Sequence, residues 1–152
     1  MKVIAYSIKS FEKEFLAKAN QKKHDITLIS NSLGLETAVF AEGKKAVIVF
    51  ATDDVSAPVI EKLAKLGIKF IVTGSAGTDH IDKDAAAISN IMIAHIPSYS
   101  SQSNLTTKDL QEIADQTIKS LDLWQANKCV GDACTCSNNC RFHNTDENPT
   151  KI

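Results

Sequence analysis

The stretch Ala46-Val47-Ile48-Val49-Phe50 decides the fold, because it is an uninterrupted apolar run rich in β-branched residues. A strand that is apolar at every position is covered on both faces, as is typical of a central strand in a parallel sheet. On either side of this run, short apolar segments alternate with amphipathic ones, which is the pattern of successive βα units. The sequence therefore predicts an α/β domain built around residues 46–50.

Strands and helices can be placed on both sides of the central run. The other expected strands are residues 2–7, 26–30, 68–73 and 91–96. Helices are expected between them. Ser10 is expected to be the N-cap of the first, whose apolar stripe consists of Phe11, Phe15, Leu16 and Ala19, and a short helix over 35–41 is expected to end at Gly43. Ser56 and Pro58 are expected to begin a helix that ends at Gly67, and Asp82 to cap a helix that ends at Asn90.

This alternation predicts a flavodoxin-like, doubly wound parallel sheet of about five strands in three α/β/α layers. In such a sheet, ligands bind at the carboxyl ends of the strands, near the point where the strand order reverses. Segments that directly follow a strand are therefore the first candidates for a functional site.

A long final helix is expected over residues 106–127, where Thr106 and Asp109 form a capping box. Its apolar face must dock either on the sheet or on a partner chain, and the second alternative would give a homo-oligomer through this helix. That face consists of Leu110, Ile113, Ala114, Thr117, Ile118, Leu121 and Trp124. Because the composition changes abruptly after Lys128, we expect one domain over residues 1–127 and a cysteine-rich tail over 128–152.

Composition excludes several classes of function. The 152 residues suffice for one domain, with 43% hydrophobic and 23% charged residues and a net charge of -1. Interspersed charges of both signs argue against binding to nucleic acid or to a membrane surface. The apolar run at the N-terminus is too short for a signal peptide, and no segment approaches transmembrane length. We therefore expect a cytoplasmic protein.

Two segments that follow expected strands could bind a ligand. In Thr73-Gly74-Ser75-Ala76-Gly77-Thr78-Asp79-His80-Ile81-Asp82, the glycines free backbone N–H groups to point at a ligand, and a helix N-terminus favours a carboxylate there. The alternative is a tight turn capped by its aspartates. In Ile96-Pro97-Ser98-Tyr99-Ser100, the Tyr99 phenol could reach the same crevice, or could simply pack the loop.

Together these two segments, with Leu66-Gly67-Ile68-Lys69-Phe70 and the opening Met1-Lys2-Val3-Ile4-Ala5-Tyr6, resemble the substrate domain of D-isomer-specific 2-hydroxyacid dehydrogenases, in particular D-lactate dehydrogenases. The likeness covers about the first two thirds of the chain. It implies that the backbone of Ser75, Ala76 and Gly77 holds a substrate carboxylate and that Tyr99 lies beside the substrate. A small 2-hydroxy or 2-oxo carboxylate is the ligand implied.

The chain also departs from that family. Members often carry arginine or another larger residue at the position of Gly74, and their catalytic Arg, Glu and His come from later in the chain, around a Rossmann domain. No G-x-G-x-x-G occurs in this sequence, and neither His80 nor His95 matches the catalytic histidine. We therefore assign no catalytic residue and no NAD site, and expect that any dehydrogenase activity would require a separate NAD-binding chain.

The four cysteines form a separate feature. Cys129, Cys134, Cys136 and Cys140 follow the spacing C-x4-C-x-C-x3-C, with His143 close behind, and the first 128 residues contain no cysteine. In a reducing cytosol, four thiolates this close together could hold zinc or an iron–sulfur cluster. The alternatives are a disordered tail or reversible disulfides. The second function predicted is thus a non-catalytic, metal- or redox-responsive sensor or interaction module.

Overall fold

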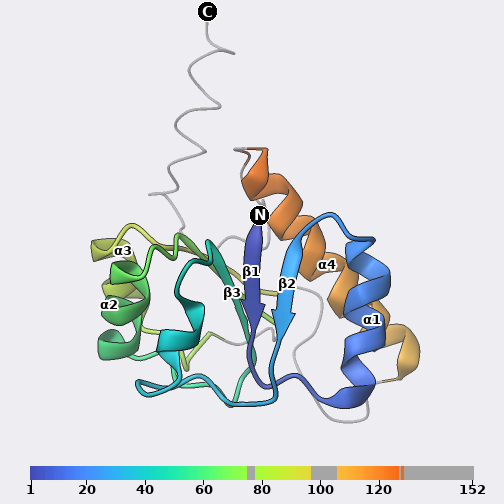
Figure 1. Ribbon diagram of the computed structural model, residues 1–152, viewed down its shortest axis with the longest axis horizontal. Helices are drawn as coiled ribbons and strands as arrows, with labels where there is room; N and C mark the ends of the chain where they lie inside the picture. The colour runs from blue at the N-terminus through green and yellow to red at the C-terminus, as the bar shows by residue number, and fades with distance from the viewer. Residues whose placement is uncertain (75–77, 97–105, 127, 129–152) are drawn as a thin grey trace, which may run out of the picture.

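The computed structural model describes residues 1–74, 78–96, 106–126 and 128 and shows a three-layer α/β/α fold (Figure 1). Its parallel sheet has five strands in the order β2-β1-β3-β4-β5, which confirms the predicted doubly wound sheet. The strands are β1 (Lys2–Ala5), β2 (Asp25–Leu28), β3 (Ala46–Val49), β4 (Phe70–Thr73) and β5 (Met92–Ala94). The helices are α1 (Ser10–Asn20), the 3-10 helix η1 (Ala38–Ala41), α2 (Ala57–Lys65), α3 (Lys83–Ile88) and α4 (Thr107–Gln125).

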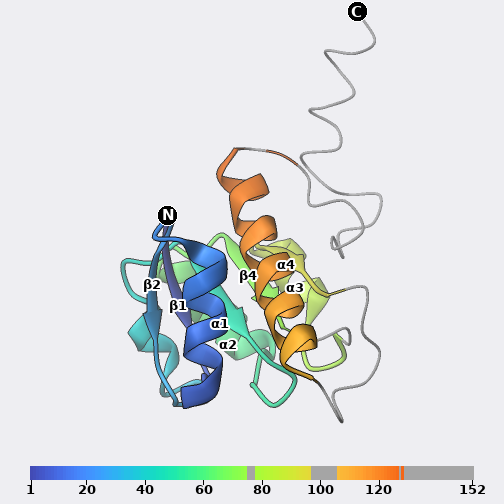
Figure 2. The same cartoon turned by 90° about the vertical axis from the view of Figure 1, so that its right-hand side faces the viewer.

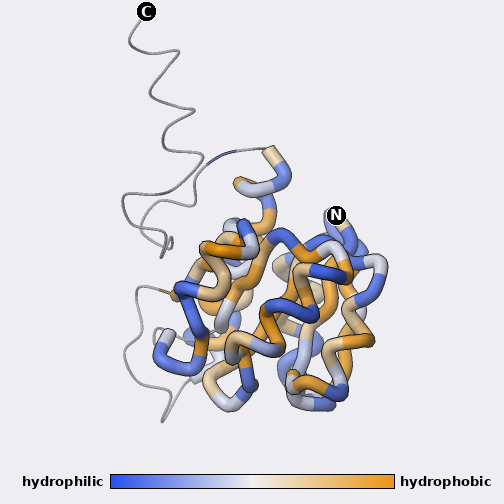
Figure 3. Tube along the Cα trace, turned by 90° about the vertical axis from the view of Figure 1, so that its left-hand side faces the viewer, coloured by the Kyte–Doolittle hydropathy of each residue, from blue (hydrophilic) through white to orange (hydrophobic). Residues whose placement is uncertain are grey.

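Each face of the sheet buries its own core because successive side chains of a strand point to opposite faces. Along β1 and the residue after it, Val3 and Ala5 pack on the side of α1 and α4, whereas Ile4 and Tyr6 pack on the side of α2, α3 and η1. All four residues of β3 are buried, as predicted for a central strand. Figure 3 shows hydrophobic and hydrophilic residues alternating along the covering helices, as expected when one helix face packs on the sheet.

Helix α4 docks on the sheet of its own chain, beside α1 (Figure 2). Trp124 is 2% exposed, and its ring stacks on Phe70 with 4.7 Å between the centroids. Gln111 also donates a hydrogen bond from Nε2 to the carbonyl oxygen of Phe15, at 3.2 Å. Of the two docking alternatives, the apolar face of this helix takes the intramolecular one.

Local details differ from the sequence-based expectations. The N-cap of α1 is Lys9 rather than Ser10, and Glu12 accepts a hydrogen bond from the backbone N–H of Lys9 at 3.0 Å. Phe11, assigned to the apolar stripe of that helix, lies in its first turn and is 56% exposed, so the buried stripe is shorter than expected. The short helix expected over 35–41 is a single 3-10 turn, and β5 is half as long as predicted.

Hydrogen bonds hold the C-terminal end of α4 at the amino-terminal edge of the sheet. Asp122 accepts hydrogen bonds from Lys23 Nζ at 2.8 Å and from His24 Nε2 at 2.7 Å. His24 is buried where the chain enters β2, and Asn20 holds its backbone through two hydrogen bonds. Lys128, the last described residue before the cysteines, therefore lies at the edge opposite to the carboxyl ends of the strands (Figure 1). Among the described helices, none combines the length and apolarity of a membrane span.

Candidate functional site

A hollow of about 760 Å³ lies at the carboxyl edge of the sheet, where a doubly wound fold is expected to bind ligands. The strand order reverses between β1 and β3, and both strands deliver residues to this hollow. Its described lining combines hydroxyl groups, one basic and one acidic side chain, and apolar surface: Ser7, Ile8, Lys9, Ser10, Phe11, Glu12, Ser30, Ser32, Phe50, Ala51, Thr52, Gly74 and Leu110. The location fits a site for a small polar molecule.

Asp53 ties together the loops that form the wall of this hollow. Its carboxylate is buried and accepts hydrogen bonds from Ser7 Oγ at 2.5 Å, Leu33 N at 2.9 Å and Phe50 N at 2.7 Å. These donors come from the segments that follow β1, β2 and β3. Three hydrogen bonds offset much of the cost of burying a carboxylate, so one side chain fixes three loops relative to one another.

Tyr6 reinforces the same region from the other face of the sheet. Its side chain is fully buried, and its hydroxyl donates a hydrogen bond to the carbonyl oxygen of Thr37 at 2.7 Å. Burial, and secondarily the negative charge of Asp53, raises the pKa of Tyr6 to about 12. The phenol is therefore neutral at physiological pH and acts as a structural donor.

The loop predicted to hold a carboxylate, Ser75 to Gly77, lies outside the described residues, but both of its flanks are fixed. On the strand side, Gly74 N donates to Val49 O at 2.8 Å. On the helix side, Ile81 pairs with Val55, and the Asp82 carboxylate caps α3 by accepting from Ala85 N at 3.0 Å. Both flanks therefore lie at the carboxyl edge of the sheet, and Gly74 forms part of the wall of the hollow.

The other predicted ligand-binding residues follow the fifth strand and the final helix in the sequence. Tyr99 and the cysteines Cys129, Cys134, Cys136 and Cys140 also lie outside the described residues. In the part of the chain that is described, no three His, Cys, Asp or Glu side chains gather as metal ligands would. The expected small-carboxylate and metal sites therefore stay predictions.

His80 is half-buried beside β4, with Nε2 at 3.3 Å from Thr73 Oγ1. Burial lowers the pKa of His80, and nearby Lys83 acts in the same direction, whereas Asp53 and Asp79 oppose the shift. The imidazole is thus mainly neutral at pH 7. This position agrees with a packing histidine that supports the end of the strand.

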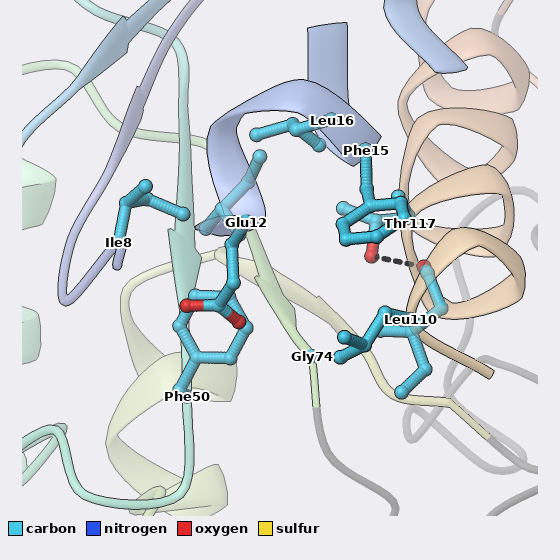
Figure 4. Close-up of a pocket in the computed structure, with 11 residues that line it drawn as sticks. Ile8, Glu12, Phe15, Leu16, Phe50, Gly74, Leu110 and Thr117 are labelled. Atoms are coloured by element: carbon cyan, nitrogen blue, oxygen red, sulfur yellow. Dashed lines mark hydrogen bonds between the residues drawn. The ribbon is translucent and has the colours of Figure 1, made fainter. Parts of the chain in front are cut away.

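A smaller cavity of about 60 Å³ opens beside the hollow, between α1, α4 and the ends of β3 and β4 (Figure 4). Most of its wall is apolar, and among the described lining residues Glu12 contributes the single ionisable side chain. The two spaces share wall residues Ile8, Glu12, Phe50, Gly74 and Leu110. They are therefore adjoining parts of one region at the carboxyl edge.

Sequence reasoning missed Asp53 and Glu12. Asp53 had one weak signal, since an acidic residue soon after a buried strand lies at the carboxyl edge of a parallel sheet. Glu12 had none, because it occupies an ordinary first-turn position in an amphipathic helix. Both acquire their surroundings from residues distant in sequence.

With the fold and the edge of the sheet established, comparison with known proteins identifies the family. Residues 2–135 match the family described as "D-isomer specific 2-hydroxyacid dehydrogenase, catalytic domain". The chain belongs to this family of catalytic domains, as the resemblance of the glycine loop and the Ile96–Ser100 segment indicated.

Individual relatives support the same conclusion. The chain is 37% identical over 101 residues to a 2-hydroxyacid dehydrogenase homolog of Zymomonas mobilis, covering 66% of this chain and 30% of that protein. The apo structure of Escherichia coli D-lactate dehydrogenase superposes with a TM-score of 0.64 at 35% identity, covering 65% of this chain and 32% of the other. A pyruvate reductase of Chlamydomonas reinhardtii gives 0.63 at 35% identity, covering 66% and 30%. The chain thus spans about a third of the length of the relatives it matches.

Proposed function

We propose that this domain binds a small 2-hydroxy or 2-oxo carboxylate at the carboxyl edge of its sheet. The backbone N–H groups of Ser75, Ala76 and Gly77 would hold the carboxylate, and the hydroxyl of Tyr99 would contact the ligand beside it. Glycine at position 77 allows the backbone to approach the anion closely.

The observation that carries the proposal is the fixed entry and exit of the 75–77 loop beside the hollow. The hydrogen bond from Gly74 N to Val49 O holds one flank, and the pairing of Ile81 with Val55 holds the other. Fixed flanks restrict the conformations open to the segment between them, so less conformational entropy is lost when a small anion binds there. Membership of the 2-hydroxyacid dehydrogenase family supports the choice of ligand class.

Hydride transfer would require a nicotinamide-binding partner. The 152 residues contain no G-x-G-x-x-G stretch to bind a dinucleotide pyrophosphate. The proposal is therefore a substrate-binding domain that works alone as a ligand-binding module, or completes an oxidoreductase with a separate NAD-binding chain.

Ligand-detected NMR with the full chain tests the proposal. Saturation-transfer spectra would be recorded with pyruvate, D-lactate and longer 2-oxoacids, and lactamide would serve as the uncharged analogue of lactate. We expect at least one carboxylate to bind and lactamide to bind about tenfold more weakly, because the N–H groups of the loop favour a negative charge.

Two variants locate the binding. Tyr99→Phe should weaken binding of the carboxylate by roughly three- to tenfold, which is the effect of losing one hydrogen bond. Lys128→Gln, which changes a residue bonded through its backbone to Leu123 at the opposite edge of the sheet, should leave affinity unchanged. If no 2-hydroxy or 2-oxo acid binds, or if lactamide binds as well as lactate, the proposal is wrong.

A further inference from the structure

The cavity between α1 and α4 has a composition unlike that of an ordinary packing defect. Of the eleven described residues around it, nine are uncharged and carry side chains, one is Gly74, and the remaining one is Glu12. A carboxylate on an otherwise apolar wall is costly unless it has a partner. The carboxylate of Glu12 therefore favours a positively charged ligand in this cavity over a neutral or negatively charged one.

Glu12 has no cationic partner within the described part of the chain. The ion pairs found there both involve Asp122, at the other edge of the sheet. One oxygen of Glu12, Oε1, accepts a hydrogen bond from Lys9 N at 3.0 Å, which fixes the direction of the carboxylate. The side chain is only partly exposed, so solvent compensates its charge incompletely.

Two aromatic side chains line the cavity together with this carboxylate. Phe15 comes from the next turn of α1 and Phe50 from the end of β3 (Figure 4). The face of an aromatic ring attracts cations through its quadrupole, and a nearby carboxylate adds a full negative charge. A carboxylate and two phenyl rings around one small space form a set of groups that recognises an organic cation.

The size of the cavity limits the head group. A water-sized atom needs about 10–15 Å³ of such volume, so the 60 Å³ present here would hold a group of only a few heavy atoms. A guanidinium or a short alkylammonium fits this volume. The remainder of a larger molecule could extend into the adjoining hollow of about 760 Å³, which shares Glu12 and Phe50.

We propose that the cavity between α1 and α4 binds a guanidinium or alkylammonium group, with Glu12 as the counter-ion and with Phe15 and Phe50 as aromatic walls. The described lining of this site comes from α1, α4 and the segments that follow β1, β3 and β4, together with Ile48 of β3. The proposal rests on these described residues and not on the proposed function.

The test is a titration of the ¹⁵N- and methyl-labelled full chain with methylguanidinium chloride, followed by NMR. N-methylurea, which has nearly the same shape without the charge, is the matched ligand, and sodium chloride controls for ionic strength. We expect saturable shifts at the backbone N–H of Gly74 and the methyl groups of Ile8 and Leu110, and about tenfold weaker binding of N-methylurea.

Variants separate this site from non-specific attraction. Glu12→Gln keeps an oxygen for the hydrogen bond from Lys9 N but removes the charge, so it should weaken the binding of methylguanidinium about tenfold. Phe50→Leu should weaken the same binding about two- to fivefold. Glu14→Gln, which alters an exposed carboxylate of the same helix, should have no effect.

Equal binding of N-methylurea and methylguanidinium, or unchanged binding in Glu12→Gln, would overturn the proposal. An absence of saturable shifts at Gly74, Ile8 and Leu110 would do the same. Pyruvate or lactate binding measured on the same sample reports on the carboxylate loop instead, so failure of one proposal is distinguishable from failure of the other.

Discussion

The ring of Phe50 occupies the space that a side chain at Gly74 would need. A Cβ at position 74 would lie 2.5 Å from Cε1 and 2.8 Å from Cδ1 of this ring, closer than non-bonded carbon atoms come. The two residues follow neighbouring strands, β3 and β4, at the carboxyl edge of the sheet. Glycine at this position therefore lets the phenyl ring form part of the wall of both the cavity and the hollow.

Gly74→Ala should destabilise the protein by about 1–3 kcal/mol, because the added methyl group forces the Phe50 ring out of its place. Urea unfolding followed by circular dichroism measures this change. Gly34→Ala is the matched control, since a Cβ there has no atom within 4 Å, and its effect should stay within about 0.5 kcal/mol. Equal effects of the two substitutions would contradict the packing argument.

Asp53→Asn should lower the free energy of unfolding by about 1–3 kcal/mol. Oδ1 accepts from Ser7 and Leu33, and Oδ2 accepts from Phe50 N, so an amide must turn an NH₂ group toward at least one donor. Asp54→Asn is the control, because that side chain is exposed and its single bond to Ser56 N needs only one oxygen. A neutral result for Asp53→Asn in urea unfolding would show that the three hydrogen bonds contribute little.

The hydrogen bonds of Asp122 with Lys23 and His24 predict that the stability of the protein depends on pH. Burial alone would raise the pKa of Asp122, but hydrogen bonds and charge from Lys23 and His24 outweigh it and hold the pKa below its ordinary value. Since the folded-state pKa is depressed, this contribution to stability is present above the unfolded-state pKa and is lost as the pH falls through the folded-state value.

Asp122→Asn should therefore be less stable than the parent chain near neutral pH, and the difference should shrink as the pH falls below about 4. Urea unfolding across a pH series measures this difference. Asp115→Asn, an exposed position on the same helix, should show a smaller and flatter difference. If the difference in free energy of unfolding between Asp122→Asn and the parent chain persists unchanged into strong acid, the ionised Asp122 carboxylate does not stabilise the fold.

The isolated chain should not bind NAD(H) usefully and should not oxidise D-lactate. The physical reason is the lack of a glycine-rich turn that would place backbone N–H groups around a pyrophosphate. Fluorescence titration with NADH and a standard absorbance assay at 340 nm are sufficient, with E. coli D-lactate dehydrogenase as the positive control. Robust turnover by the pure chain would contradict this prediction.

The cysteine-rich tail should bind about one zinc ion per chain, or a cluster after anaerobic reconstitution. Thiolates rather than thiols bind metal, so loading should release protons. Cys134→Ser and Cys136→Ser should abolish metal binding while the main domain stays folded, because residues 1–128 contain no cysteine. Metal analysis of the reduced protein, with circular dichroism of the variants, measures both outcomes. A metal-free reduced protein would favour reversible disulfides.

Much of the fold follows from local patterns in the sequence. The apolar run of β3 indicates a strand buried on both faces, and Asp82 and Thr106 cap the helices that they were expected to begin. Gly67 ends α2 with a φ of 102°, a conformation that glycine adopts at little cost. These features depend on residues within a few positions of one another, where periodicity and capping chemistry act directly.

The tertiary structure alone decided which distant residues meet. Glu12, Phe50 and Gly74 come from different βα units and share a cavity only because the strand order places β1, β3 and β4 side by side. The same holds for Asp53, whose three donors follow three different strands. Periodicity shows which face of an element is buried, but the neighbour across that face is fixed by strand order and by the crossing of helices over the sheet.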